Sequence, residues 1–202
     1  YKNLSSMTFY DRGEMLKKVA LYLLERKKKY YELSYKTGAT HVDSWVDIEG
    51  GFGTFFTYSG LAKRMLPNTP FWVDGDVQKI SENGTHLGTH SLTPSEGVSI
   101  QINAYNFPVW GMLEKIAVNL LAGVPAIVKP ATATSFLTEV VVKEIIASQI
   151  LPEGSLQLIC GSANGILDNV TMEDVVTFTG SASTVKMLKS HPRILEESVP
   201  FN

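Results

Sequence analysis

The second half of the chain alternates short apolar runs with amphipathic segments, and this alternation limits the possible folds more than any other feature. Val124–Val128, Leu156–Ile159 and Val175–Phe178 are short runs typical of buried strands. Apolar residues at helical spacing precede the first run, at 110–121, and lie between the first and second runs, at 137–145. Strands separated by helices pair in parallel sheets with right-handed crossovers. The sequence therefore predicts an α/β fold built on a parallel sheet.

The first half is predicted to be mainly helical. An amphipathic helix is expected from Thr8, its N-cap, to the basic run Arg26–Lys29. We interpret this run as a solvated helix end favoured by the helix dipole, rather than as a nucleic-acid contact. A second helix is expected over 42–65. Gly50-Gly51 interrupts its pattern, and close packing against a neighbouring element would explain glycines there.

The Thr-rich stretch 85–103 changes period, and we interpret it as a β-hairpin. Its turn lies at 94–97, and one apolar strand spans 98–102. His86 and His90 lie on this hairpin, but no third metal ligand is apparent near them. We therefore predict no metal site.

Composition excludes several classes of protein. Hydrophobic residues make up 44% of the 202 residues, too many for a disordered chain. The net charge of −2 lacks the basic excess of a nucleic-acid binder, and no apolar run approaches the roughly 18 residues of a membrane helix. Cys160 has no second cysteine to pair with, which favours a reducing, cytoplasmic compartment. It ends an apolar strand, so we interpret it as a core residue rather than a nucleophile. The chain starts at Tyr1 and stops on an extended stretch, so we expect a piece of a longer polypeptide or a processing boundary.

Ligands of open α/β sheets bind beyond the carboxyl ends of the strands, and three such ends carry unusual residues. Lys129 directly follows a strand, where it either binds a phosphate or ribose hydroxyl or snorkels at the sheet rim. Gly180 and Ser181 follow the strand that ends at Phe178, either to approach a pyrophosphate closely or for turn geometry only. Asn106 either donates to a developing oxyanion or caps the next helix.

Four motifs lie along the chain at 102–108, 122–132, 151–154 and 178–181. In this order they resemble the aldehyde dehydrogenase superfamily. The resemblance covers nearly the whole sequence. Within the superfamily it looks closest to the aldehyde dehydrogenase domain of the bifunctional enzyme of phenylacetate degradation, the PaaZ type. The segments that suggest this type lie at 43–51, 107–115 and 174–182.

The resemblance implies a Rossmann-like cofactor-binding domain, incomplete here, and a chemistry. A cysteine thiolate attacks an aldehyde, an asparagine amide holds the oxyanion, a hydride passes to nicotinamide, and a glutamate activates water. By motif position, Asn106 resembles the oxyanion asparagine. The residues that resemble cofactor contacts are Ile102, Asn103, Ala104, Lys129, Pro130, Thr132, Phe178, Gly180 and Ser181.

The resemblance also bears on cofactor choice. NAD-preferring relatives often carry a glutamate at the position of Thr132, and that carboxylate would repel a 2′-phosphate. Thr132 is neutral, and Lys129 adds positive charge nearby. NADP is therefore the expected cofactor, with NAD as the alternative.

The chain also departs from the family pattern. The family's catalytic glutamate and cysteine have no match in it, and Cys160 lies on the wrong side of the 178–181 motif. Val185 stands where relatives tend to have a second glycine, which puts a close approach there in doubt. We therefore expect the 202 residues alone to be inactive.

Together these observations predict one partial cofactor-binding domain over 1–202. It comprises a helical region at 1–75, a hairpin arm at 76–104 and a Rossmann-like part at 105–202. The parent enzyme is expected to oxidise an aldehyde, specifically a CoA-thioester semialdehyde of phenylacetate catabolism, to the acid with NADP. The arm resembles the family's oligomerisation arm, so at least a dimer is expected, with no nucleic-acid or membrane partner. The alternatives are an acylating or other aldehyde dehydrogenase and a non-catalytic nucleotide-binding or assembly module.

Overall fold

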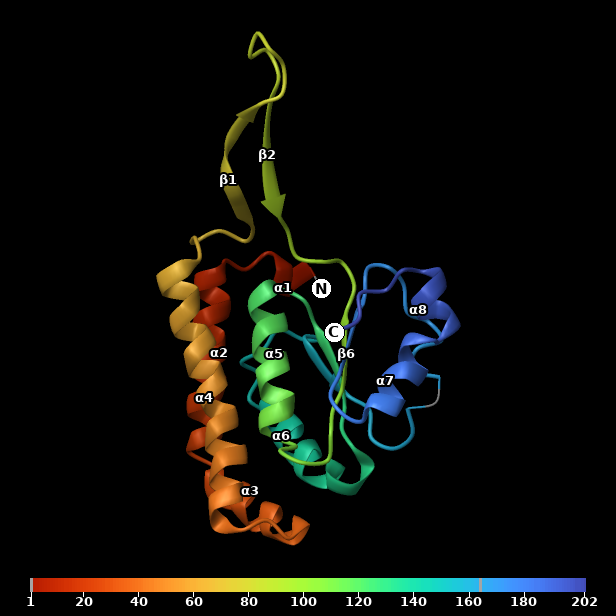
Figure 1. Cartoon of the computed structure of the whole chain (residues 1–202). Helices are drawn as coiled ribbons and strands as arrows, with labels where there is room; N and C mark the ends of the chain where they lie inside the picture. Colours follow the sequence, from red (N-terminus) through yellow and green to blue (C-terminus); the bar gives the residue numbers. More distant parts are fainter. Residues whose placement is uncertain (1, 164) are drawn as a thin grey trace.

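A four-stranded parallel sheet with strand order β5-β4-β3-β6 lies at the centre of the fold. The computed structural model describes residues 2–163 and 165–202 (Figure 1). The strands are β3 (Ser99–Ile102), β4 (Ala126–Lys129), β5 (Leu156–Leu158) and β6 (Val175–Phe178). Ile102 pairs with both Lys129 and Phe178, so three strands end at one level. The predicted α/β fold with a parallel sheet is confirmed.

Helices cover both faces of the sheet. On one face α5 and α6 pack on the strands, and α2 and α4 form an outer layer that shares the larger apolar core. On the other face, α7 and α8 enclose a smaller core with β3 and β6. The helical elements are α1 (Lys2–Ser5), α2 (Phe9–Leu24), α3 (Lys27–Ser34), η1 (Tyr35–Thr37), α4 (His41–Met65), α5 (Trp110–Ala122), η2 (Thr132–Thr134), α6 (Ser135–Ala147), α7 (Ala182–Lys189) and α8 (Pro192–Glu196). None of these helices is both long and apolar enough to cross a membrane.

Local sequence signals set the ends of the long helices. Thr8 caps α2, as predicted: its hydroxyl accepts a hydrogen bond from the Asp11 backbone N–H, while the Asp11 carboxylate accepts one from Thr8. Thr40 and Asp43 form the same capping box at the start of α4. Such boxes satisfy N–H groups that a helix start leaves unpaired.

Helix α4 is continuous from His41 to Met65, so the glycines do not break it. A Cβ on Gly50 would lie 2.8 Å from the Trp110 ring, and one on Gly51 would lie 3.1 Å from the Trp110 Cα. The predicted reason for these glycines, close packing against a neighbouring element, is confirmed. They let α4 approach the first residue of α5 more closely than side chains would allow.

The hairpin prediction was wrong in its strands. The hairpin pairs β1 (Trp72–Lys79) with β2 (Leu87–Leu92) and projects away from the rest of the chain (Figure 1). Strand β3 belongs instead to the centre of the parallel sheet, so neither the hairpin at 85–103 nor the arm at 76–104 describes the structure. The error has a physical cause. Ser99 and Gln101 are buried polar residues, and they give a fully buried strand the alternating pattern of a half-exposed one.

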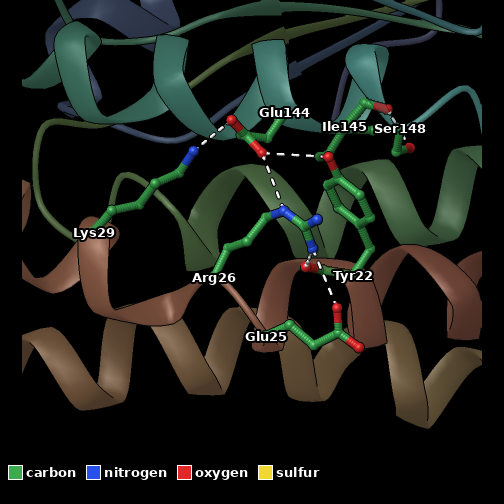
Figure 2. Close-up of polar contacts among 7 residues, drawn as sticks. All are labelled: Tyr22, Glu25, Arg26, Lys29, Glu144, Ile145 and Ser148. Atoms are coloured by element: carbon green, nitrogen blue, oxygen red, sulfur yellow. Dashed lines mark hydrogen bonds and ion pairs between the residues drawn. The ribbon is translucent and has the colours of Figure 1, made fainter.

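The basic run lies at a junction between helices rather than at one helix end. Arg26 follows α2 and donates to the Tyr22 carbonyl, as expected near a helix C-terminus. Lys27 and Lys29, however, begin α3, where the helix dipole disfavours cations. Carboxylates from other helices pair with the basic run. The Glu144 carboxylate of α6 forms ion pairs with both Arg26 and Lys29 (Figure 2), and that of Glu49 of α4 lies 2.9 Å from Lys27 Nζ. The run therefore ties three helices together.

Candidate functional site

The carboxyl ends of β3, β4 and β6 open onto one shallow cavity of about 590 Å³. Six of the ten residues predicted to form the site line it. These six come from two segments that are far apart in the sequence, 103–106 and 178–181, which the parallel pairing of β3 with β6 brings to one edge. The lining residues are Asn103, Ala104, Tyr105, Asn106, Ala131, Phe178, Thr179, Gly180, Ser181 and Thr184.

The other four predicted residues lie at or next to the same edge. Ile102 and Lys129 are register partners, and the Asn103 backbone N–H donates to the Lys129 carbonyl at 3.0 Å. Lys129 and Pro130 are buried, whereas Thr132 is exposed and donates its hydroxyl hydrogen bond to the Gly161 carbonyl at 3.3 Å. The structure therefore brings all ten residues to one end of the sheet.

A buried amide at the end of β3 is held from the neighbouring helix. Lys115 of α5 donates from Nζ to the Asn103 side-chain oxygen at 2.7 Å. Burial lowers the pKa of the Lys115 ammonium to about 8, while the charge on Glu114 opposes that shift. The Asn103 Nδ2 is buried and has no hydrogen-bond partner among the described residues. Sequence reasoning missed Lys115, although a lysine among the apolar residues of a helix was a usable signal.

Asn106 is exposed on the loop that joins β3 to α5. The next residue, Phe107, has φ of +51°, a left-handed conformation that is costly for a bulky side chain. Behind this loop lies a second cavity of about 340 Å³, which Asn106 and Phe107 line together with Asp47 and Thr134. Asn106 thus stands between two cavities, one toward the β6 end and one toward α3 and α4.

Two buried polar groups hold this loop from other elements. Asp47 of α4 accepts hydrogen bonds through Oδ1 from the backbone N–H groups of Val109 and Trp110, at 3.0 and 2.8 Å. Burial raises the pKa of the Asp47 carboxyl to about 6, and the two N–H groups partly offset that shift. Thr134 donates to the Tyr105 carbonyl at 3.1 Å. Thr134 occupies the N-cap position of α6, but its side chain makes no capping hydrogen bond because its hydroxyl binds the loop.

The turn after β6 combines geometry with an open surface. Ser181 caps α7, since its Oγ accepts from the Thr184 N–H at 3.3 Å, so the Gly-Ser pair has a role in the geometry of the turn. A Cβ on Gly180 would lie 2.4 Å from the Phe178 ring, so a larger residue there would displace that ring. Both residues also line the 590 Å³ cavity, so a cap does not exclude contact with a ligand.

Cys160 was predicted to be a core residue, and this prediction was wrong. Its side chain is exposed because β5 ends at Leu158 and is the edge strand of the four, so the chain has already left the sheet. It does not line the cavity beside Asn106. Within residues 2–163 and 165–202, no three His, Cys, Asp or Glu side chains gather as a metal site would require.

Comparison with solved structures gives the fold. A 3,6-anhydro-L-galactose dehydrogenase in complex with NAP matches 99% of this chain with a TM-score of 0.83 and 23% identity, over 40% of its own length. Betaine aldehyde dehydrogenase from Staphylococcus aureus in complex with NAD+ matches 98% of this chain with a TM-score of 0.81 and 24% identity, over 38% of its own length. These likenesses show a shared architecture.

Comparison of sequences is more specific. A 3,4-dehydroadipyl-CoA semialdehyde dehydrogenase from Aromatoleum evansii is 37% identical over 200 residues, which are 98% of this chain and 39% of that protein. A D-glyceraldehyde dehydrogenase (NADP(+)) from Picrophilus torridus is 27% identical over 91% of this chain and 36% of its own length. The chain thus spans less than two fifths of the length of these two relatives. The family model described as "Aldehyde dehydrogenase family" matches residues 1–195, and the chain belongs to this family.

Proposed function

We propose that this chain is the greater part of the cofactor-binding domain of an NADP-dependent enzyme that oxidises an aldehyde to a carboxylic acid. One observation carries the proposal: the ten residues chosen from sequence motifs, spread over 80 positions, meet at one end of the parallel sheet. This is where open α/β sheets bind ligands. Family membership supplies the reaction type.

The edge of the sheet suits a dinucleotide. Gly180 and Ser181 line the cavity where a pyrophosphate would lie, and Lys129 brings a cation to the end of β4, the strand next to Ile102. The buried Asn103 Nδ2, which has no partner among the described residues, is a further donor at the same edge. When bound, the nicotinamide nucleotide would accept the hydride from the substrate. The chain's own residues would hold and orient it.

Asn106 would act on the substrate directly. Its exposed amide can donate a hydrogen bond to the oxygen that gains negative charge when a nucleophile attacks the aldehyde carbon. Removing a single such donor typically slows an enzyme by about a hundredfold to a thousandfold. The nucleophile and the base that activates water are expected from parts of the enzyme outside these 202 residues.

NADP is proposed over NAD on two features. Thr132 is neutral and exposed at the start of η2, so no carboxylate at that position repels a 2′-phosphate. Lys129 adds a positive charge on the adjacent strand end. Titration of the full-length enzyme with both nucleotides tests this, and tighter binding of NAD would contradict it. Lys129→Met should weaken NADP binding by about tenfold to a hundredfold, the usual loss for a hydrogen bond to a charged group.

The proposed substrate is a CoA-thioester semialdehyde of phenylacetate catabolism. The relative from Aromatoleum evansii, named for a CoA semialdehyde, supports this class. Steady-state assays of the full-length enzyme on a CoA-thioester semialdehyde, the free semialdehyde acid and a short alkyl aldehyde would rank the substrates. Equal kcat/KM for all three would reject the CoA class. When free CoA is supplied, conversion of the short alkyl aldehyde to its acyl-CoA instead of the free acid would identify an acylating enzyme. Binding without turnover would identify a non-catalytic module.

The proposed assembly is at least a dimer, located in the cytoplasm. The hairpin carries exposed apolar side chains on both strands, including Trp72, Val77 and Leu92, and a partner subunit would cover them. Light scattering of the full-length enzyme tests this, and a monomer across the micromolar range would contradict it.

A further inference from the structure

The loop that carries Asn106 is held in an unfavourable backbone conformation by groups outside it. Phe107, with φ of +51°, would relax toward negative φ if nothing opposed it. The Phe107 carbonyl accepts from the Gly111 N–H at 2.9 Å, which joins the strained residue to the first turn of α5. The position of Asn106 therefore depends on what fixes that first turn.

Asp47 fixes it. Its Oδ1 accepts hydrogen bonds from the N–H groups of Val109 and Trp110, the two residues at the start of α5, and the residue is only 4% exposed. The start of α5 has no cap from its own chain segment, because Val109 occupies the N-cap position and has no polar side chain. The Asp47 carboxylate of α4 thus acts as the N-terminal cap of α5 and also complements the dipole of that helix.

The glycine pair of α4 makes this contact possible. Gly51 lies one turn beyond Asp47 on the same helix and abuts the Trp110 backbone, so α4 and the start of α5 approach closely at this point. On the other side of the loop, Thr134 binds the Tyr105 carbonyl. Asn106 is thereby held between one anchor that precedes it and one that follows it.

We propose that Asp47 is a positioning residue for aldehyde oxidation: by capping α5 from α4 it holds the strained Phe107 and so aims the Asn106 amide at the reacting oxygen. This rests on the proposed function, in which Asn106 is the oxyanion donor. Asp47 contributes no atom to the reaction. Its effect is on the barrier more than on cofactor binding, because Lys129 and the turn at 178–181, which hold the cofactor in the proposed function, lie on other segments.

The test compares Asp47→Ala, Asp47→Asn and Asp43→Asn in the full-length enzyme. Asp47→Ala removes the hydrogen-bond acceptor, and kcat should fall by about tenfold to a hundredfold, the scale expected when a reacting group is misplaced. The KM for NADP should stay near its parental value. Asp47→Asn keeps an oxygen acceptor and should restore most of kcat. Asp43, one turn earlier on α4, bonds only its own helix start, so its Asn variant is the matched control.

A second measurement does not depend on turnover. Amide hydrogen exchange of Val109 and Trp110 should quicken by about tenfold or more in Asp47→Ala, the loss of a hydrogen bond, and stay unchanged in Asp43→Asn. Thr134→Val, which keeps the side-chain shape, should lower kcat with the same unchanged KM if Asp47→Ala fails to fold. Parental kcat in folded Asp47→Ala, or in Thr134→Val when Asp47→Ala does not fold, overturns the proposal. A parent enzyme that oxidises no aldehyde rejects the proposed function instead, and the exchange data still show whether Asp47 anchors the loop.

Discussion

The helices on one face of the sheet and the β1–β2 hairpin both carry large apolar side chains, but the helices bury them and the hairpin exposes them. Leu16, Val19 and Leu23 of α2 are fully buried against neighbouring helices. Trp72, Val77 and the rest of β1 are exposed. The inner faces of these helices are thus buried within this chain, whereas these hairpin side chains stay exposed among the residues that the structure describes.

The same contrast holds for polar groups. The helical layer buries Arg12 completely, and its guanidinium donates to the carbonyls of Leu4, Ser5, Pro70 and Leu121. Polar side chains on the hairpin bond mostly to close neighbours, as Ser81 does with Asn83. Buried polar contacts of long range specify how elements pack, and exposed local ones shape a single turn. Substitutions in the two regions should therefore differ sharply in cost.

The largest effect is expected for Arg12→Met. Methionine fills similar space but leaves four carbonyls, two buried and two partly buried, without the Arg12 donor, and each buried acceptor left unsatisfied costs about 1–3 kcal/mol. Chemical denaturation should show this loss. Arg64→Met, at an exposed position on α4, is the control and should change stability by no more than about 0.5 kcal/mol. Equal losses for both would break the contrast between buried and exposed polar groups.

Asp47 should make stability depend on pH in an unusual direction. Its pKa is raised to about 6 in the folded chain, so the unfolded chain loses this proton at lower pH than the folded chain does. Stability should therefore fall as pH rises from about 4 to 6, by about 3 kcal/mol at 1.36 kcal/mol per pKa unit. Denaturation across this range, compared with Asp47→Asn, isolates the effect.

Asp43 supplies the opposite case on the same helix. Hydrogen bonds from Thr40 lower the pKa of its carboxyl, so its stabilising contribution is present near neutral pH and is lost as pH falls through the lowered pKa. Asp43→Asn should flatten the acid limb of the profile and leave the fall between pH 4 and 6 in place. A fall that persists in Asp47→Asn would assign it to another group.

Gly51→Ala should cost about 1–3 kcal/mol, as overpacking of a close contact does. The new Cβ would press on the Trp110 backbone. Gly53→Ala, on the same helix, meets nothing within 4 Å and should stabilise by about 0.5–1 kcal/mol through helix propensity. Thermal unfolding of the pair measures the difference, and equal signs would show that α4 and α5 are not in close contact.

The smallest effect on folding is expected in the hairpin. Val77→Lys should change the unfolding free energy by no more than about 0.5 kcal/mol, because the side chain is 63% exposed. In the full-length enzyme it should nevertheless weaken subunit association, which sedimentation velocity would detect. Val77→Thr keeps the branched shape without the charge and should associate as the parent does.

The sequence was most informative where a pattern depends on local periodicity. The strand at 175–178 and the capping of α2 by Thr8 were predicted correctly. The strand predicted at 124–128 lies at 126–129, and the helical pattern at 110–121 forms α5. Family motifs were equally useful for the site, because three of the four include the carboxyl end of a strand and the parallel register aligns those ends, while the motif at 151–154 precedes β5.

What could not be predicted depends on contacts between distant segments. Asp47 acts on residues 62 and 63 positions away, and nothing in its own helix marks it as a cap for another. Exposure of Cys160 follows from strand order, which sets β5 at the edge of the four. Ser99 and Gln101 misled the hairpin prediction because they are buried polar residues, and the alternating pattern that they give a central strand is the same as that of a half-exposed strand.

The sequence separation between contacting residues also predicts the order in which parts of the chain fold. The hairpin turn closes contacts only five residues apart, between Ser81 and His86, and loops of that size close in well under a microsecond. The β6 side is joined to β3 by contacts such as that of Val98 with Asp174, 76 residues apart, and Arg12 reaches Leu121 across 109 residues. Such distant contacts form slowly, because chain entropy is lost before they stabilise anything. The cavity beside Asn106 needs β6, so the binding edge should be among the last parts of the chain to form, long after the hairpin.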